Sequence, residues 1–281
     1  MWKQKVSASI SNSYPIPTPE IIKSMKIIGF EAVAPEWNNH ESFAKIMEAV
    51  NECGIEISSV HAPFTARPSL LWSKNAETVE NAKQIMIEFL NDCITYKVPV
   101  AVVHSWEDND DSEPYEEGFK PYDEIVDYAT KNGICIAFEN VEKPDIYLDA
   151  LLKRYADNDK VGFCWDSGHE MAFTPGQNLL EKYGDRLMAT HIHDNLGVSS
   201  FDGTTTHSDD LHLFPGEGIA DWDEQITRLK NAKKQEYLNL EIARNAHKFR
   251  HENFWHRQIT LDQYYTIVYM CACKLGAKYI K

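Results

Sequence analysis

The chain has 281 residues, of which 43% are hydrophobic and 25% are charged. This composition is that of a globular protein, and it excludes disordered, fibrous and collagen-like chains. Lys and Arg number 28 against 43 Asp and Glu, so the formal net charge is −15. A chain this acidic repels polyanions, and nucleic acid is therefore not expected as a partner.

The six cysteines form no CxxC pair, and most lie in apolar runs: Cys53, Cys93, Cys135, Cys164, Cys271 and Cys273. This usage predicts buried free thiols in a reducing compartment. The first residues lead into polar Ser and Asn rather than the apolar region of a signal peptide. The sequence contains no run of 18 or more apolar residues, so no membrane-spanning helix is predicted. We therefore expect a cytoplasmic location and no membrane partner.

Short apolar runs alternate with amphipathic stretches along the chain. The first unit pairs a strand over residues 6–10 with a helix that runs from Thr18, the predicted N-cap, to about Gly29. Further strands are expected at 30–34, 55–60, 99–103, 134–138, 161–165, 187–192 and 237–242. Helices are expected after them at about 40–53, 75–96, 122–132, 144–156, 178–183, 222–232 and 253–275.

These eight strand–helix units predict an α/β fold, a single (β/α)₈ TIM barrel. Continuous apolar strands that alternate with helices indicate a parallel sheet, and the length suits one closed barrel. No glycine-rich turn follows the first strand, so a dinucleotide fold has no support. We expect one domain over residues 1–281. The longest loop, 195–220, is too long for a plain connector and is expected to carry function.

A histidine or a carboxylate stands at the C-terminal end of six consecutive predicted strands. These residues are His61, His104, Glu139, Asp166 with His169 one turn later, His191 with His193, and Glu241. A single such histidine is more often a hydrogen-bonding residue, and a single glutamate can pair with an arginine. Several buried carboxylates at one barrel mouth, however, are costly without a cation. The set therefore predicts a divalent metal site, with zinc or manganese as candidates.

The long loop adds a second pattern, Asp210-Leu211-His212. An Asp-x-His pair can hold a metal ion from one side, or it can simply stabilise the loop. Three tryptophans near the predicted rim, Trp37, Trp72 and Trp106, are able to stack on a sugar, although ordinary packing is the commoner role. Arg67 and Lys74 are the basic residues of the loop after the third strand.

Seven short motifs follow the strand ends in order: HAPF at 61–64, VVH at 102–104, FEN at 138–140, CWDSGH at 164–169, HIHDN at 191–195, DDLHLFPGEGIADWDE at 209–224 and LEI at 240–242. Together they resemble the xylose isomerase-like TIM barrel superfamily. That group contains isomerases and epimerases of sugars and sugar phosphates, and also abasic-site endonucleases of the endonuclease IV type.

The resemblance implies a shared metal site of Glu139, Asp166, His191 and Glu241, with His191 chosen by the family's H-x-x-D pattern. In the isomerase branch the two glutamates also move the substrate's proton, which makes Glu139 and Glu241 the candidate catalytic residues. The nuclease branch builds a three-zinc cluster with five more ligands, and all five positions are filled here: His61, His104, His169, Asp210 and His212.

Two departures favour the isomerase branch. The segment after the first metal histidine is Ala-Pro-Phe, whereas the nucleases place a DNA-wedging segment there. The loops 11–17 and 35–40 contain no Lys or Arg, although a DNA groove needs cations. We therefore expect a metal-dependent isomerase or epimerase of a small carbohydrate that works through a metal-stabilised enediolate, with one to three ions per chain.

Several alternatives stay open at this point. The five additional ligands can hold further metal ions or bind substrate, and His193, Trp37, Trp106 and Arg67 are weaker candidates for substrate contacts. A zinc phosphodiesterase with three ions and a metal-dependent binding barrel without catalysis are the rival functions. The last predicted helix, rich in tyrosine, can pack on the barrel or on a second copy in a homo-oligomer.

Overall fold

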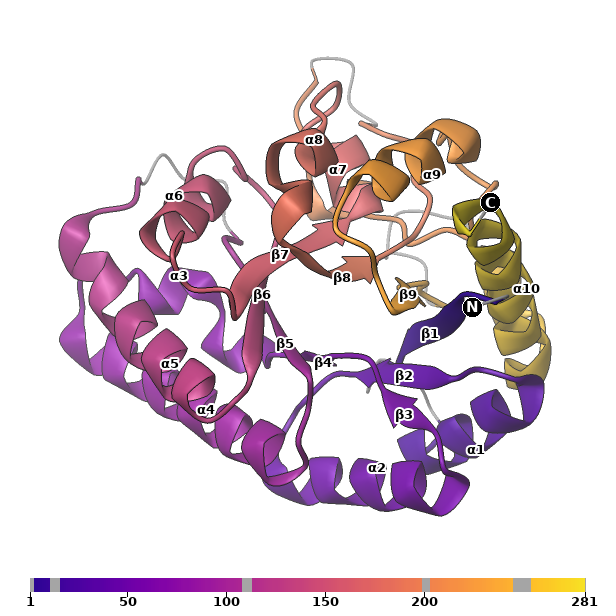
Figure 1. Ribbon diagram of the computed structural model, residues 1–281, viewed down its shortest axis with the longest axis horizontal. Helices are drawn as coiled ribbons and strands as arrows, with labels where there is room; N and C mark the ends of the chain where they lie inside the picture. Colours follow the sequence, from indigo (N-terminus) through magenta and orange to yellow (C-terminus); the bar gives the residue numbers. More distant parts are fainter. Residues whose placement is uncertain (1–2, 11–15, 108–112, 199–202, 245–253, 281) are drawn as a thin grey trace.

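The fold was analysed in a computed structural model, which describes residues 3–10, 16–107, 113–198, 203–244 and 254–280. The described residues form parallel strands around a central axis, with helices on the outside (Figure 1). The strands are β1 (Lys5–Ile10), β2 (Ala32–Pro35), β3 (Glu56–Ile57), β4 (Val60–His61), β5 (Val100–His104), β6 (Cys135–Glu139), β7 (Val161–Asp166), β8 (Leu187–His191) and β9 (Tyr237–Leu240).

The strands pair in two parallel sheets, β3-β2-β1-β9 and β4-β5-β6-β7-β8. Single parallel bridges join the sheets at both seams, between Glu36 and His61 and between Ile192 and Leu240. β3 and β4 are two halves of the predicted third strand, which Ser58 and Ser59 interrupt. Eight strand positions therefore surround the axis, and the predicted TIM barrel is confirmed.

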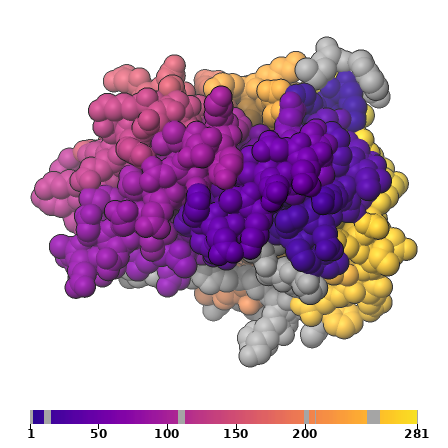
Figure 2. All heavy atoms as spheres, turned by 90° about the horizontal axis from the view of Figure 1, so that it is seen from below, coloured from indigo at the N-terminus to yellow at the C-terminus, as the bar shows by residue number. Residues whose placement is uncertain are grey.

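Helices cover the outside of this barrel: α1 (Thr18–Ile28), α2 (His40–Cys53), α3 (Pro68–Leu71), α4 (Ala76–Thr95), α5 (Phe119–Lys131), α6 (Tyr147–Arg154), α7 (Ser167–Phe173), α8 (Leu179–Tyr183), α9 (Trp222–Asn231) and α10 (Leu261–Tyr279). Figure 2 shows one side of this layer, where the indigo and purple N-terminal segments lie between magenta atoms and the yellow atoms of α10. No helix in the described ranges is both long and apolar enough to cross a membrane.

Helix ends differ from the predictions where local hydrogen bonds decide them. Thr18 is the first residue of α1 rather than its cap, and Pro17 occupies the N-cap position. The last helix was expected from about Asn253, which lies outside the described residues. A separate turn, η5 (Phe254–Arg257), comes first, and α10 begins only after Thr260, because Thr260 and Gln263 form a reciprocal capping box.

Two layers of side chains fill the barrel interior at its C-terminal half. Val102, Ala137, Cys164 and Ala189 form a small buried cluster of their own. Each precedes by two positions a residue of the next layer: His104, Glu139, Asp166 and His191. Because side chains two apart on a strand point to the same face, both layers face the axis. The polar layer therefore lies directly above a floor of small side chains.

Candidate metal centre

The first ligand group combines the ends of three strands with the residue just after β9. The side-chain ligand atoms of Glu139, Asp166, His191 and Glu241 all lie within 4.8 Å of one another. Nδ1 of His191 is 3.0 Å from Oε2 of Glu139 and 2.9 Å from Oε2 of Glu241. Ligand atoms around a zinc ion lie roughly 3.3–3.6 Å apart at bond lengths of about 2.0–2.2 Å. The two distances at His191 are slightly shorter than this range and the whole group lies within 4.8 Å, so small side-chain adjustments would place the four atoms around one cation.

Unpartnered polar atoms support this fit. Both carboxylate oxygens of Glu139 and Nδ1 of His191 are buried and have no hydrogen-bond partner, although the ion-pair distances between them are short. Glu139 is completely buried, and His191 is 1% exposed. Burying such groups without partners costs several kcal/mol each, by order of magnitude. A divalent ion is the chemical group that satisfies two carboxylates and an imidazole at once.

A second group brings His61 of β4 and His104 of β5 onto the other side of Glu139. The Nε2 atoms of the two histidines are 2.9 Å apart, and each is 3.8 Å from Oε2 of Glu139. Nδ1 of His61 donates to the carbonyl of Ala62, so its neutral ring presents a lone pair at Nε2. Nδ1 of His104 contacts the carboxylate of Glu107. The contacts made by the two Nδ1 atoms orient both rings so that their Nε2 atoms point toward the same place beside Glu139.

The third group joins α7 to the long loop through His169, His193, Asp210 and His212. Oδ2 of Asp210 is 3.2 Å from Nε2 of His169 and 2.8 Å from Nε2 of His212. Nδ1 of His169 donates to the carbonyl of Asn140, and Nδ1 of His212 donates to that of Glu241. Such backbone contacts are the usual way a protein orients metal-binding imidazoles.

His193 links the first and third groups. Its Nε2 is 2.9 Å from Oδ1 of Asp166, and its ring stacks on His212 with 4.0 Å between the centroids. Gly168 makes room for this ring, because a Cβ there would meet Cε1 of His193 at 1.8 Å. The sequence indicated that His193 faces the site, and the structure places it between Asp166 and the long loop.

The motif around Asp166 folds as it does because one carboxylate caps a helix. Oδ1 of Asp166 accepts from the backbone N–H of His169 at 2.6 Å and so opens α7. The side chain of Asn140 exchanges two hydrogen bonds with the backbone of Asp166, at 2.8 and 2.9 Å. This pairing fixes the end of β7 against β6. The short helix α7, which the sequence analysis missed, then places His169 over the barrel mouth.

Electrostatics keep the carboxylate of Glu139 ionised. Burial acts to raise the pKa of Glu139, but His191 and His104 outweigh it and hold this pKa well below its ordinary value. Burial and the neighbouring His104 lower the pKa of His61 to about 4. Burial acts to lower the pKa of His104, but the neighbouring Glu107 and Glu139 outweigh it and raise this pKa to about 9. The centre therefore presents anionic oxygens and a neutral imidazole to a cation.

The long loop is anchored by Asp194, the aspartate of the H-x-x-D pattern. Its Oδ2 accepts from the backbone N–H of Gly216 and from Nε1 of Trp222, at 2.8 and 2.9 Å. Its Oδ1 accepts from the backbone N–H groups of Asn195 and Ala220, at 2.9 and 3.1 Å. Through these hydrogen bonds, Asp194 holds the loop that carries Asp210 and His212 against the barrel.

The candidate substrate contacts have different surroundings. Trp37 is buried and donates through Nε1 to Asp92 at 2.7 Å, and Trp106 stacks on Tyr147 at 4.0 Å. Packing thus occupies much of both rings and leaves little surface for a sugar. Arg67 is exposed. Burial acts to raise the pKa of Glu107, but His104 outweighs it, and Arg67 is close enough to lower this pKa further.

Sequence reasoning missed two residues beside the centre. Phe64 is 53% exposed and stacks on His61 with 5.1 Å between the ring centroids, so an apolar ring stands at the mouth. Cys164, in the layer below, has its thiol within 4.8 Å of ligand atoms of Glu139 and His191. Burial raises the pKa of Cys164 to about 12. Side chains alternate between the two faces of a strand, so the sequence of β7 already predicts that Cys164 and Asp166 share a face. This pattern could have identified Cys164.

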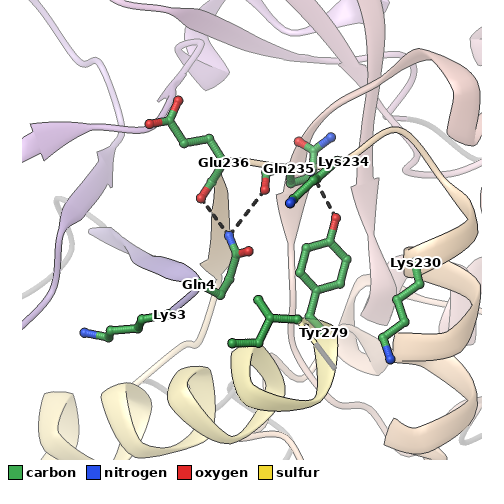
Figure 3. A pocket seen from close by; sticks show the side chains of 8 residues that line it. Lys3, Gln4, Lys230, Lys234, Gln235, Glu236 and Tyr279 are labelled. Carbon is green, nitrogen blue, oxygen red and sulfur yellow. Dashed lines mark hydrogen bonds between the residues drawn. The ribbon is translucent and has the colours of Figure 1, made fainter. Parts of the chain in front are cut away.

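A separate cavity of about 500 Å³ opens at the other end of the barrel (Figure 3). Gln4 precedes β1 and Gln235 precedes β9, so the cavity lies at the N-terminal ends of these strands. Nε2 of Gln4 donates to two backbone carbonyls there, and the hydroxyl of Tyr279 accepts from the N–H of Gln235. Because TIM barrels place their active sites at the C-terminal face, this cavity is not the candidate site.

The fold and the site define a TIM barrel with a candidate metal centre at the C-terminal ends of its strands. The chain belongs to the xylose isomerase-like TIM barrel family, whose model matches residues 22–259. The uncharacterized protein y4fM of Sinorhizobium fredii (strain NBRC 101917 / NGR234) is 32% identical over 149 residues. These residues are 51% of this chain and 44% of that relative, so the chain spans less than half of that relative's length.

Solved structures show the same fold. A D-tagatose 3-epimerase-like protein has a TM-score of 0.64 and 23% identity, with 95% of this chain and 98% of that chain covered. The IolI protein, solved with a bound zinc atom, has a TM-score of 0.70 and 16% identity, with 98% and 99% covered. These similarities establish the barrel, and similar structures of this fold include sugar epimerases.

Proposed function

We propose that the chain is a divalent-metal-dependent isomerase or epimerase that acts on a small carbohydrate. The observation that carries this proposal is the pair of carboxylates, Glu139 and Glu241, that meet at Nδ1 of His191 from two different strands. Together with Asp166 they would hold a zinc or manganese ion. Such an ion supplies a Lewis acid that polarises a substrate carbonyl. A solved structure of the same fold, a D-psicose 3-epimerase in the presence of D-fructose, supports the same class of reaction.

The two carboxylates would move the proton. One takes it from the carbon beside the carbonyl, and the electron pair of the broken C–H bond shifts into the carbonyl group. The other returns a proton, to the opposite face for an epimerase or to the neighbouring carbon for an isomerase. The side chain of Glu241 is 21% exposed and that of Glu139 is completely buried, so Glu241 lies nearer the substrate side. Positioned acid–base groups contribute about 10²–10⁴-fold each.

The remaining polar groups would bind the substrate. The Nε2 atoms of His61 and His104 lie beside Glu139, and that of His169 lies beside Asp210, where they can meet sugar hydroxyls or a second ion. Phe64 offers an apolar ring at the same mouth, which suits the C–H face of a sugar. A cytoplasmic location belongs to the same proposal, because all six cysteines are free.

The test is proton exchange at carbon. Protein loaded with Mn²⁺, Co²⁺ or Zn²⁺ is incubated with a panel of ketoses and aldoses in D₂O, and nuclear magnetic resonance follows deuterium at the carbon beside the carbonyl. Chromatography of the same samples identifies epimers and isomers. Metal-dependent exchange that Glu241→Gln removes is the expected result. Absence of exchange with every sugar and every metal would refute the proposal.

A zinc phosphodiesterase is the second candidate, and one observation favours it. Glu139 belongs to the first ligand group and also to the group of His61 and His104, so two groups share one carboxylate. Such sharing is what a cluster of two or three ions needs to clamp a phosphate and activate water. The net charge of −15 and the absence of Lys and Arg from residues 35–40 weigh against DNA as its substrate.

Metal content separates the two candidates. Elemental analysis after saturation with zinc gives the number of ions per chain, and a content of three ions per chain would favour the phosphodiesterase. Hydrolysis of bis(p-nitrophenyl) phosphate and cleavage of a duplex with an abasic site are measured on the same preparation. Hydrolysis without carbon exchange would support the phosphodiesterase, and exchange without hydrolysis would exclude it.

A further inference from the structure

Cys164 lies on the floor of the candidate centre. It stands two residues before Asp166 on β7, so both side chains face the barrel axis. It is completely buried, and its neighbours in the same layer are Val102, Ala137 and Ala189, which carry no ligand atom. Among these four floor residues, the thiol of Cys164 alone is able to bind a metal ion.

The thiol is near atoms that lack partners. The sulfur of Cys164 lies within 4.8 Å of a ligand atom of Glu139 and of one of His191, and these two also lie within that distance of each other. Both carboxylate oxygens of Glu139 and Nδ1 of His191 are buried without hydrogen-bond partners. A buried cysteine is often no more than a small apolar residue. Here, however, two other unsatisfied ligands share its surroundings.

We propose that Cys164 supplies a thiolate ligand to a thiophilic divalent ion held between Glu139 and His191, and thereby sets the metal preference of the centre. The thiol proton leaves to the solvent as the metal–sulfur bond forms. This inference rests on the metal centre of the proposed function, and it adds a sulfur ligand to the carboxylates and imidazole already assigned there.

The ligand set decides which ions benefit. Thiolate ligands favour Zn²⁺, Co²⁺ and Cd²⁺, whereas oxygen ligands suit Mn²⁺ and Mg²⁺. Glu139 and His191 belong to both sets: with Cys164 they form a sulfur-containing group, and with Asp166 and Glu241 they form a harder one. A thiophilic ion would use the floor cysteine, and manganese would be held by the carboxylates above. Loss of the thiol should therefore weaken zinc and cadmium binding and leave manganese binding nearly unchanged.

Cobalt provides a direct readout that needs no enzyme assay. The full chain is stripped with a chelator and titrated with Co²⁺ while its absorption spectrum is recorded. Coordination by sulfur produces a near-ultraviolet sulfur-to-cobalt charge-transfer band, and this band should be lost in Cys164→Ser and Cys164→Ala. The visible cobalt bands, which report binding itself, should remain in both variants.

Cys93→Ser is the matched control. Cys93 is also completely buried, but it lies in α4 and belongs to none of the ligand groups among the described residues. Its substitution should leave the charge-transfer band unchanged. In competition titrations, the ratio of zinc to manganese affinity should fall about 10–100-fold in Cys164→Ser and stay constant in Cys93→Ser.

The outcomes distinguish the two levels of the proposal. Visible cobalt bands without a sulfur band in the wild-type protein would overturn the role of Cys164 and leave the carboxylate–histidine centre standing. A protein that binds no cobalt at all would overturn both. A sulfur band that survives in Cys164→Ser would assign the thiolate to another cysteine and also reject the inference.

Discussion

Hydrogen bonds on the outer side of the histidine rings determine what their inner nitrogens can do. His61, His169 and His212 each donate through Nδ1 to a backbone carbonyl, so in the neutral form of each ring the lone pair is at Nε2. His191 differs, because its Nδ1 faces the two glutamates. The rings are therefore oriented before any ion arrives, which lowers the entropic cost of metal binding.

Glu139 is the residue whose loss should cost most, because two ligand groups share it with His191 and a third shares it with His61 and His104. Glu139→Gln is expected to reduce turnover by at least about 10²-fold and to lower the metal content, since an amide is a poor substitute for a carboxylate. Circular dichroism should report an intact fold. Turnover on the best substrate and elemental analysis measure the two effects.

Glu241→Gln is the comparison for Glu139→Gln. Glu241 belongs to a single ligand group, so its variant should lose turnover while retaining more of its metal. Full activity in Glu139→Gln would contradict the assigned role, and equal metal loss in both variants would contradict the idea that Glu139 is shared.

The candidate ligands were predictable from the sequence because they end strands that are otherwise apolar. Glu107 could not be identified, since it lies three residues past β5 and only the fold brings it against His104. Phe64 lay in the Ala-Pro-Phe segment, which the sequence analysis used only as a difference from the nuclease branch. Cys164 resembled any other buried thiol, because nothing in the sequence shows that Glu139 and His191 lack partners nearby.

At the scale of elements, the loop between β8 and α9 depends on one carboxylate. Asp194→Asn would place an amide N–H₂ against N–H groups that now donate to Asp194, among them those of Gly216 and Ala220. Losing hydrogen bonds to a charged acceptor should cost about 2–3 kcal/mol in the free energy of unfolding, measured by urea denaturation. Under the proposed function, any ion bound by Asp210 and His212 should be lost with the loop, which elemental analysis detects.

Asp221→Asn serves as the control in the same segment. Asp221 caps α9 by accepting from the backbone of Asp223 and Glu224, so its variant should cost about 1 kcal/mol or less. Its metal content should stay at the wild-type value. If both variants lost the same ions, Asp194 would have no special role in positioning the loop.

The contact between α5 and α6 should depend on pH. Arg154 donates to both oxygens of Asp123 at 2.7 and 2.6 Å, and this lowers the pKa of Asp123. Because the folded pKa lies below the unfolded value of about 3.9, the pair stabilises the fold above that pH. The stabilisation is lost as the pH falls through the folded value.

Asp123→Asn should therefore lower the free energy of unfolding by about 0.5–1 kcal/mol at pH 7 and by less at pH 3. The figure is modest because the side chains of Asp123 and Arg154 are 40% and 28% exposed to solvent. Asp127→Asn, on the same helix, removes only an exposed pair with Lys131 and should have a smaller effect. A cost for Asp123→Asn that grew toward acid pH would reverse the sign and reject this explanation.

The order of the elements followed from apolar periodicity, because most barrel strands are buried on both sides; the short β3, with Glu56 exposed, is an exception. The errors lie where hydrogen bonds or turns override periodicity. Ser58 and Ser59 split the third strand, and the carboxylate of Asp166 starts a helix that is too short to show a periodic pattern. β9 ends at Leu240, two residues before the predicted end at 242, and leaves Glu241 just past the strand; apolar patterning does not resolve such a difference.

At the scale of the whole molecule, the two ends of the barrel differ in the side chains that they present. The C-terminal end gathers the ionisable groups, while the N-terminal end contains the cavity at Gln4 and Tyr279. That residues 1–281 form one domain stays a prediction, and the curated relative is more than twice as long as the segment it shares with this chain. The stability of the barrel should nevertheless be tied to its metal content.

Removal of metal should destabilise the whole fold. Without a cation, Glu139 and Asp166 are buried close together, and only the neighbouring histidines offset the repulsion between the two carboxylates. An ion present at about 100 times its dissociation constant adds about 2.7 kcal/mol to the free energy of unfolding. For a chain of this size, that corresponds to a rise in Tm of roughly 5–10 °C.

Thermal denaturation of chelator-treated protein, with and without added Zn²⁺ or Mn²⁺, measures this shift. The same additions should raise the Tm of Glu139→Gln much less, because that variant lacks the shared ligand, while Asp123→Asn should respond like the wild-type chain. This comparison separates a specific centre from general binding of cations to an acidic surface. Equal shifts in Glu139→Gln and the wild type would mean that the ions act elsewhere on the molecule.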